Sequence, residues 1–177
     1  MNTIRIFIAD DHAMFREGLR ALFAALPDIE VVGEAANGMD AVTQVSALQP
    51  DVVLMDINMP NLNGIEATRQ ILAAQPGLGI IMVTMLEDDA SVFAAMRAGA
   101  RGYVLKGAHH DEILQAIRAV ATGQAVFGPA IATRMMNFFQ GLNPTSKTGI
   151  PVQAFPELTE REREVLVLIA QVFRTKN

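Results

Sequence analysis

Val52-Val53-Leu54-Met55-Asp56 places four consecutive apolar residues directly before a carboxylate. An unbroken apolar run of this length is typical of a strand that is buried on both faces, and such strands occur mainly in parallel sheets. Strand and helix patterns alternate on both sides of this run. The sequence therefore predicts an α/β fold around a parallel sheet.

The elements on either side of this strand repeat one pattern. Short apolar segments are followed by amphipathic segments with helical spacing and Gly or Pro near their ends. The other predicted strands are Ile4–Ala9, Glu30–Ala35, Ile80–Val83 and Tyr103–Leu105. The predicted helices are Ala13–Leu26, Asp40–Leu48, Gly64–Ala74, Ala90–Ala98 and Asp111–Thr122. Five such units predict right-handed crossovers and helices on both faces of the sheet.

The composition narrows the class of protein. The chain has 177 residues, 51% of them hydrophobic, which is ample for a packed core. Its lack of cysteine excludes disulfides and thiolate chemistry. No apolar run approaches the roughly 18 residues of a membrane-spanning helix, and the N-terminus lacks a signal-peptide pattern. We therefore expect a cytoplasmic protein that does not enter the membrane.

The alternation ends near Gly128, and three parts are expected. Residues 1–128 form the α/β domain, and residues 129–157 form a helix, Ala130–Phe139, and a linker. Residues 158–177 begin a further helical segment with a capping box at Thr159-Glu160-Arg161-Glu162. The first part is net acidic and the remainder slightly basic, a difference too small to indicate nucleic-acid binding by itself.

Polar residues that could take part in catalysis or ligand binding directly follow the predicted strands. Asp10 and Asp11 follow the first strand, Asp56 the third, Thr84 the fourth and Lys106 the fifth. In a parallel sheet these positions share the carboxyl edge, where open α/β sheets bind ligands. We therefore expect three carboxylates, a hydroxyl and an ammonium to meet in one cleft.

This set of groups favours phosphoryl transfer. Close carboxylates repel one another unless a cation neutralises them, and Mg²⁺ takes one or two carboxylates together with phosphate oxygens. Asp56 is placed to attack phosphorus as a nucleophile, while the metal, Lys106 and the Thr84 hydroxyl stabilise the phosphoryl oxygens. The resulting acyl phosphate is labile, which suits a reversible signal.

Each residue alone has a simpler interpretation. Asp is a common turn residue, and a single Thr or Lys at a strand end is usually structural; only their convergence indicates a site. Tyr103 is compatible with a core position and with a functional one. His109 and His110 are expected to be solvated, with side chains that diverge at the start of a helix.

These motifs together resemble the receiver domain of bacterial two-component response regulators of the NarL/FixJ type. The resemblance covers Ile4–Gly128. It rests on Asp10-Asp11, on Asp56-Ile-Asn-Met-Pro60 followed by Gly64, on Thr84, and on Gly99-Ala-Arg-Gly-Tyr-Val-Leu-Lys106.

The resemblance implies a flavodoxin-like fold with strand order 2-1-3-4-5. It implies that Asp56 accepts a phosphoryl group from a sensor histidine kinase. It further implies Mg²⁺ held by the side chains of Asp11 and Asp56 and by the Asn58 backbone carbonyl, with Asp10 assisting through water. Thr84 and Tyr103 would form the conformational switch.

The C-terminal segment resembles the opening of a LuxR-type helix-turn-helix domain at Leu158-Thr-Glu-Arg-Glu-Arg-Glu-Val-Leu166. The helix that would enter the major groove is absent from the sequence. We therefore expect a transcriptional regulator as parent protein, with DNA binding only in a full-length parent. The apolar stripe of the remaining helix predicts packing on its own receiver or association of two copies.

The alternative to a signalling protein is an enzyme. Aspartyl-phosphate hydrolases of the haloacid dehalogenase type also use a strand-end Asp, Mg²⁺, Thr and Lys. They need a second carboxylate two residues after the nucleophile, where this chain has Asn58, and a cap insertion that is missing. The sequence favours a signalling switch that is not an enzyme.

Overall fold

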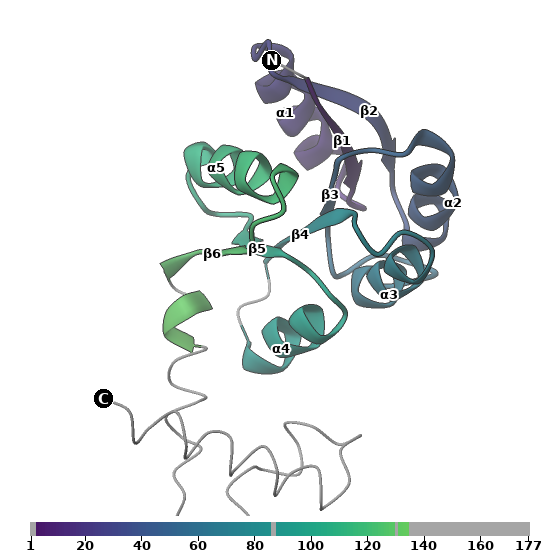
Figure 1. Cartoon of the computed structure of the whole chain (residues 1–177), viewed down its shortest axis with the longest axis vertical. Coiled ribbons are helices and arrows are strands. Elements are labelled where there is room, and N and C mark those ends of the chain that lie inside the picture. Colours follow the sequence, from purple (N-terminus) through teal and green to yellow (C-terminus); the bar gives the residue numbers. More distant parts are fainter. Residues whose placement is uncertain (1–2, 86–87, 130, 135–177) are drawn as a thin grey trace, which may run out of the picture. The chain divides into compact units, whose positions relative to one another are not determined.

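The computed structural model describes residues 3–85, 88–129 and 131–134. Residues 1–132 form one compact unit, built on a parallel sheet with helices on both faces (Figure 1). The strands lie in the order β2-β1-β3-β4-β5-β6. Their bounds are β1 Ile4–Ala9, β2 Ile29–Ala35, β3 Val52–Met55, β4 Gly79–Thr84, β5 Gly102–Leu105 and β6 Val126–Phe127.

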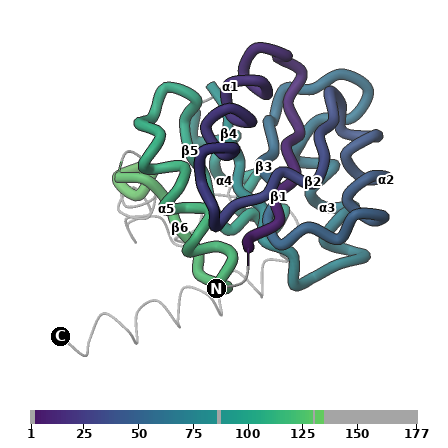
Figure 2. Tube along the Cα trace, turned by 90° about the horizontal axis from the view of Figure 1, so that it is seen from above, coloured from purple at the N-terminus to yellow at the C-terminus, as the bar shows by residue number. Residues whose placement is uncertain are grey.

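Five helices connect the strands and cover the sheet. Their bounds are α1 Ala13–Ala24, α2 Gly38–Leu48, α3 Gly64–Ala74, α4 Asp89–Arg97 and α5 His110–Ala121. Helices α1 and α5 pack on one face, and α2 and α3 lie on the other, as the two views show (Figures 1 and 2). Every strand pair is parallel, so the ends of all strands share the same two edges.

The core follows from alternation along the strands. Ile6 and Ile8 of β1 join the cluster beneath α1 and α5, and Phe7 between them is also buried but points to the other face. All four residues of β3 are buried, as expected for a strand covered on both sides. Asp56 directly follows this central strand and is itself buried.

Four of the described helices begin at side-chain caps, and at α5 the ring of His109 accepts a hydrogen bond from the backbone N–H of Asp111. Asn37, Asn63 and Asp88 each accept a hydrogen bond from the backbone N–H three residues later, at the starts of α2, α3 and α4. Such caps satisfy N–H groups that lack a partner in the helix. The cap at Asn63 fixes the start of α3 close to the end of β3.

The sheet has six strands, not the five expected. The first five take the predicted order 2-1-3-4-5, and β6 pairs with β5 through Gly102–Val126 and Tyr103–Phe127. Two residues are too few to show strand periodicity, so the sequence pattern did not reveal β6. Of the helix predicted at Ala130–Phe139, residues 131–134 are helical, and so is Pro129 directly before the predicted start. Its remaining residues, the linker and residues 158–177 lie outside the described residues. Among the described residues no helix is long and apolar enough to cross a membrane.

Candidate functional site

The carboxyl edge of the sheet brings together the residues predicted to meet there. Asp10 directly follows β1, Asp56 follows β3 and Lys106 follows β5. Thr84 was expected directly after the fourth strand, but β4 includes it as its last residue. Backbone hydrogen bonds tie these ends together: Asp56 N–H donates to Ala9 O at 2.8 Å, and Lys106 N–H donates to Thr84 O at 2.9 Å.

Lys106 joins two buried carboxylates. Its Nζ lies 2.7 Å from Asp10 Oδ2 and 2.7 Å from Asp56 Oδ2, and both aspartates are only 2% exposed. Burial lowers the pKa of Lys106, but the hydrogen bonds to Asp10 and Asp56 and the attraction of both carboxylates outweigh it. The pKa of Lys106 is therefore raised, and its ammonium stays charged beside the acids.

The same cluster has room for a divalent cation. One ligand atom from each of Asp10, Asp11, His12 and Asp56 can be chosen so that all lie within 4.8 Å of one another. Three ionised carboxylates and the single ammonium of Lys106 leave two negative charges. A hard divalent ion such as Mg²⁺ would balance that charge with oxygen ligands. The donor set thus fits the metal that the sequence predicts.

Residues of the loop between β3 and α3 contact the side chain and the backbone of Asp56. Asn58 N–H lies 3.4 Å from Asp56 Oδ1, and Gly64 N–H donates to Ile57 O at 2.9 Å. A Cβ built on Gly64 would stand 1.9 Å from the carbonyl oxygen of Asp56. Only glycine allows this close approach, so the position of Asp56 depends on Gly64. The role of the Asn58 carbonyl as a metal ligand stays a prediction.

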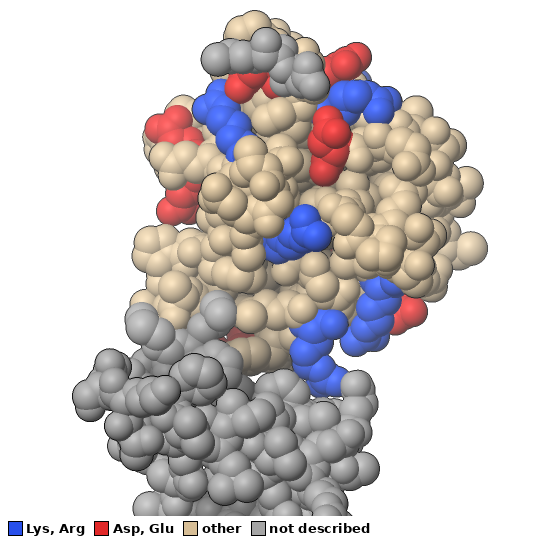
Figure 3. Space-filling model, viewed as in Figure 1, with Lys and Arg blue, Asp and Glu red and all other residues tan. Residues whose placement is uncertain are grey.

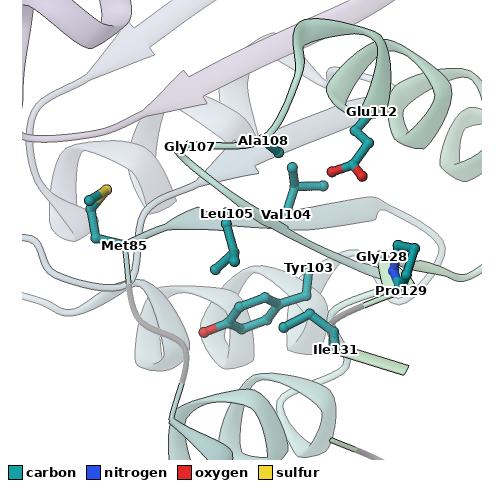
Figure 4. Close-up of a pocket in the computed structure, with 10 residues that line it drawn as sticks. All are labelled: Met85, Tyr103, Val104, Leu105, Gly107, Ala108, Glu112, Gly128, Pro129 and Ile131. Carbon is teal, nitrogen blue, oxygen red and sulfur yellow. The ribbon is translucent and has the colours of Figure 1, made fainter. Parts of the chain in front are cut away.

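Thr84 and Tyr103 are both buried and lie on adjacent strands. Tyr103 is opposite Met82 in the register of β4 and β5, two residues before Thr84. The ring of Tyr103 lies beside Ile131 in a cavity of about 450 Å³, which Met85 also lines (Figure 4). Tyr103 is therefore a core residue, and free volume lies next to its ring. Its role as a switch stays a prediction.

The two neighbouring histidines do not diverge. The ring centroids of His109 and His110 are 4.1 Å apart, with the planes tilted by 34°. His109 is the extended N-cap residue of α5 and His110 is its first helical residue, and the change in backbone direction brings the rings together. Both side chains are exposed, as predicted. With Asp111 they form a second group of potential metal ligands, all of them exposed.

Sequence reasoning missed three residues beside the cluster. His12 Nδ1 lies 2.7 Å from Asp11 Oδ1, and Arg16 donates to the backbone carbonyl of Asp10 at 2.7 Å. Lys106 Nζ also stands 4.9 Å from the centre of the Phe15 ring, a cation–π distance. His12 could have been found from its place directly after the acidic pair. Phe15 and Arg16 gave no signal, because their helical periodicity alone does not show which strand end they face.

Charges of both signs are scattered over the described surface seen in Figure 3. Red side chains lie mostly in the upper part of this face, and blue ones occur in both parts, separated by large uncharged areas rather than joined into one broad patch. Nucleic-acid surfaces need a concentrated basic patch. This face of the described residues therefore gives no support for DNA binding by the α/β domain.

Comparison with known proteins places the fold and site in one family. The response regulator receiver domain matches residues 6–118. The chain is 36% identical over 169 residues to the response regulator protein VraR of Staphylococcus aureus, covering 96% of this chain and 77% of that protein. The chain belongs to the two-component response regulators and contains their receiver domain.

Solved structures agree with this assignment. A LuxR-family two-component response regulator from Aurantimonas sp. SI85-9A1 has a TM-score of 0.73 and 38% identity, covering 77% of this chain and 97% of that one. The signal receiver domain of the response regulator NarL from Mycobacterium tuberculosis has a TM-score of 0.67 and 30% identity, covering 70% and 100%. The resemblance to NarL-type and LuxR-family regulators is confirmed, and the hydrolase alternative has no support.

Proposed function

We propose that Asp56 is the phospho-acceptor of this receiver domain and that a sensor histidine kinase is the donor. The observation that carries the proposal is the buried Asp56 carboxylate, hydrogen-bonded to Lys106 and clustered with Asp10 and Asp11 at the carboxyl edge. Receiver domains as a class are signalling proteins phosphorylated by histidine kinases. Asp10 is equally buried and shares the Lys106 ammonium, but of the two only Asp56 directly follows the central strand β3.

Phosphoryl transfer needs a nucleophile and charge stabilisation. A carboxylate oxygen of Asp56 forms the new O–P bond while the N–P bond of the donor phosphohistidine breaks and its electron pair returns to the imidazole. Lys106 remains charged, because its pKa is raised, and stabilises the phosphoryl oxygens electrostatically. The Thr84 hydroxyl, at the end of the adjacent strand, donates a hydrogen bond to them.

The metal completes this charge balance. The side chains of Asp11 and Asp56 and the Asn58 carbonyl would hold Mg²⁺, with Asp10 acting through a water. Bound there, the ion supplies positive charge to the transferring phosphoryl group. The fit rests on the two unbalanced negative charges of the cluster.

The signal would leave the site through Thr84 and Tyr103. Thr84 moves toward the phosphoryl group, and Tyr103 shifts in the space around its ring, where the cavity gives it room. The two arrangements must differ in affinity for the phosphoryl group, or no signal is passed on.

Residues 1–128 would act as the receiver, 129–157 as a helix and linker, and 158–177 as the start of a helix-turn-helix domain. In this scheme two copies of the chain associate.

The test is labelling by a small-molecule phosphodonor, followed by intact mass. The native chain should gain one phosphoryl group with Mg²⁺ and far less with a chelator. Asp56→Asn should abolish the gain, because an amide is not a nucleophile. Asp111→Asn is the matched control, since Asp111 is an exposed acid at the start of α5. Equal labelling of Asp56→Asn and the native chain would refute the assignment.

A further inference from the structure

The side chain of His12 is turned into the carboxylate cluster. Its Nδ1 lies 2.7 Å from Asp11 Oδ1 and 3.2 Å from Asp10 Oδ1. The same nitrogen is 3.5 Å from Lys106 Nζ. His12 thus presents one defined ring atom to the acids, and that atom belongs to the group of four ligand atoms that lie within 4.8 Å of one another.

These separations suit ligands on one metal ion. With metal–ligand bonds of about 2.1 Å, two ligands at a right angle are about 3 Å apart. The distances from His12 Nδ1 to the carboxylate oxygens of Asp11 and Asp10 lie on either side of that value. A cation among these atoms could be reached by the imidazole after only small adjustments.

The helix does not need this side chain. His12 is the N-cap residue of α1, yet its side chain makes no capping hydrogen bond. It is 65% exposed, so little packing holds it in place. Its polar side-chain contacts in the described residues are those with the acids and with Lys106, and they place a ring nitrogen where it can join the carboxylates as a metal ligand.

We propose that His12 supplies a nitrogen ligand to the metal site, which makes it a mixed oxygen–nitrogen site. Imidazole favours first-row transition ions such as Co²⁺, Ni²⁺ and Zn²⁺, whereas Mg²⁺ favours oxygen. The site therefore selects these ions over Mg²⁺ more strongly than carboxylates and a carbonyl alone would. This inference rests on the proposed function, because it concerns the same metal site.

The composition of the chain allows a clean test. The whole sequence has three histidines and no cysteine, so the only other imidazoles are His109 and His110. Their group with Asp111 could bind the same ions. An untagged protein with His109→Asn and His110→Gln removes that group, and Asn keeps a good N-cap for α5. In this background any imidazole bound to a metal is that of His12.

The first measurement detects the nitrogen directly. Mn²⁺ bound to the background protein is examined by pulsed EPR for coupling to a directly bound nitrogen. We expect an imidazole coupling that changes on ¹⁵N-histidine labelling and is lost in His12→Ala. Because labelling leaves the sequence unchanged, this readout does not depend on how the variant folds. Bound Mn²⁺ without histidine nitrogen coupling overturns the proposal.

The second measurement compares affinities. The ratio of the Mg²⁺ to the Co²⁺ dissociation constant should fall about tenfold in His12→Ala, on the scale of losing one supporting contact of a metal site. Met14→Ala, an exposed neighbour on α1, should leave the ratio unchanged. An unchanged ratio in His12→Ala overturns the nitrogen ligand alone, while the proposed function stands. Failure of the background protein to bind either ion overturns both.

Discussion

Removing the Lys106 charge tests the electrostatics of the cluster. Lys106→Met keeps an unbranched apolar side chain of similar length but leaves Asp10 and Asp56 without their ammonium. The side chains are 8% exposed for Lys106 and 3% for each aspartate, so water offers little compensation. Breaking a buried ion pair by removing one partner costs about 3–5 kcal/mol. Since the Lys106 side chain is somewhat more exposed than those of the two aspartates, we expect the lower end, about 3 kcal/mol.

The cost should depend on divalent cations. The cluster carries two negative charges with Lys106 and three without it, so a metal ion should stabilise the variant more than the native chain. At a Mg²⁺ concentration well above both dissociation constants, each tenfold tighter binding by the variant stabilises it by about 1.4 kcal/mol relative to the native chain. We therefore expect Mg²⁺ to reduce the difference in unfolding free energy between Lys106→Met and the native chain.

Urea unfolding followed by circular dichroism, with EDTA or with Mg²⁺, measures both effects. Arg69→Met is the matched control, because Arg69 pairs with Glu66 on the exposed surface of α3 and such a pair is worth less than about 1 kcal/mol. A loss below about 1 kcal/mol for Lys106→Met in EDTA would show that the buried pair does not hold the site together.

Three further variants probe other parts of the account. Gly64→Ala should destabilise the fold by about 3 kcal/mol, on the scale of severe core overpacking, because its Cβ meets the Asp56 carbonyl. Gly77→Ala is the control, since a Cβ at Gly77 meets nothing within 4 Å. Equal melting temperatures for the two variants would contradict the contact at Gly64. Thr84→Ala should accept the phosphoryl group but give much smaller NMR shift changes in α4 and β5, and native-like changes would place the switch elsewhere. The hydrogen bond from Arg118 lowers the pKa of Asp28, so this pair stabilises the fold above the unfolded-state pKa of Asp28, and the contribution is lost as the pH falls through the lowered value. The difference in unfolding free energy between the native chain and Asp28→Asn should thus shrink below about pH 4, and a constant difference down to pH 2 would argue against it.

The sequence predicted three elements with the bounds that the structure has. They are the strands Ile4–Ala9 and Val52–Met55 and the helix Gly64–Ala74, where continuous apolar runs and a capped, amphipathic helix leave strong patterns. Several other elements differ from the predicted bounds by one or two residues at their ends, where periodicity gives the weakest signal. The two residues of the strand Val126–Phe127 are extended because they pair with the edge strand β5. Such pairing with a distant segment cannot be seen in a local sequence pattern.

The candidate site was predictable in its position but not in its contacts. The rule that ligands bind at the carboxyl ends of parallel strands located Asp10, Asp56 and Lys106. That Lys106 bridges the two acids, and that Gly64 packs on the Asp56 carbonyl, depends on side-chain and loop geometry set by the tertiary fold. His12 was visible in the sequence, but its approach to Asp11 was not.

The central claim is that Asp56 carries an acyl phosphate. Phosphorylated protein can be reduced with borohydride, which converts an aspartyl phosphate to homoserine, and then mapped by peptide mass spectrometry. The account predicts one converted residue, Asp56, formed only when phosphodonor and Mg²⁺ are both present. Conversion at another aspartate, or a phosphoryl group retained on His12, His109 or His110 with Asp56 unmodified, would contradict it.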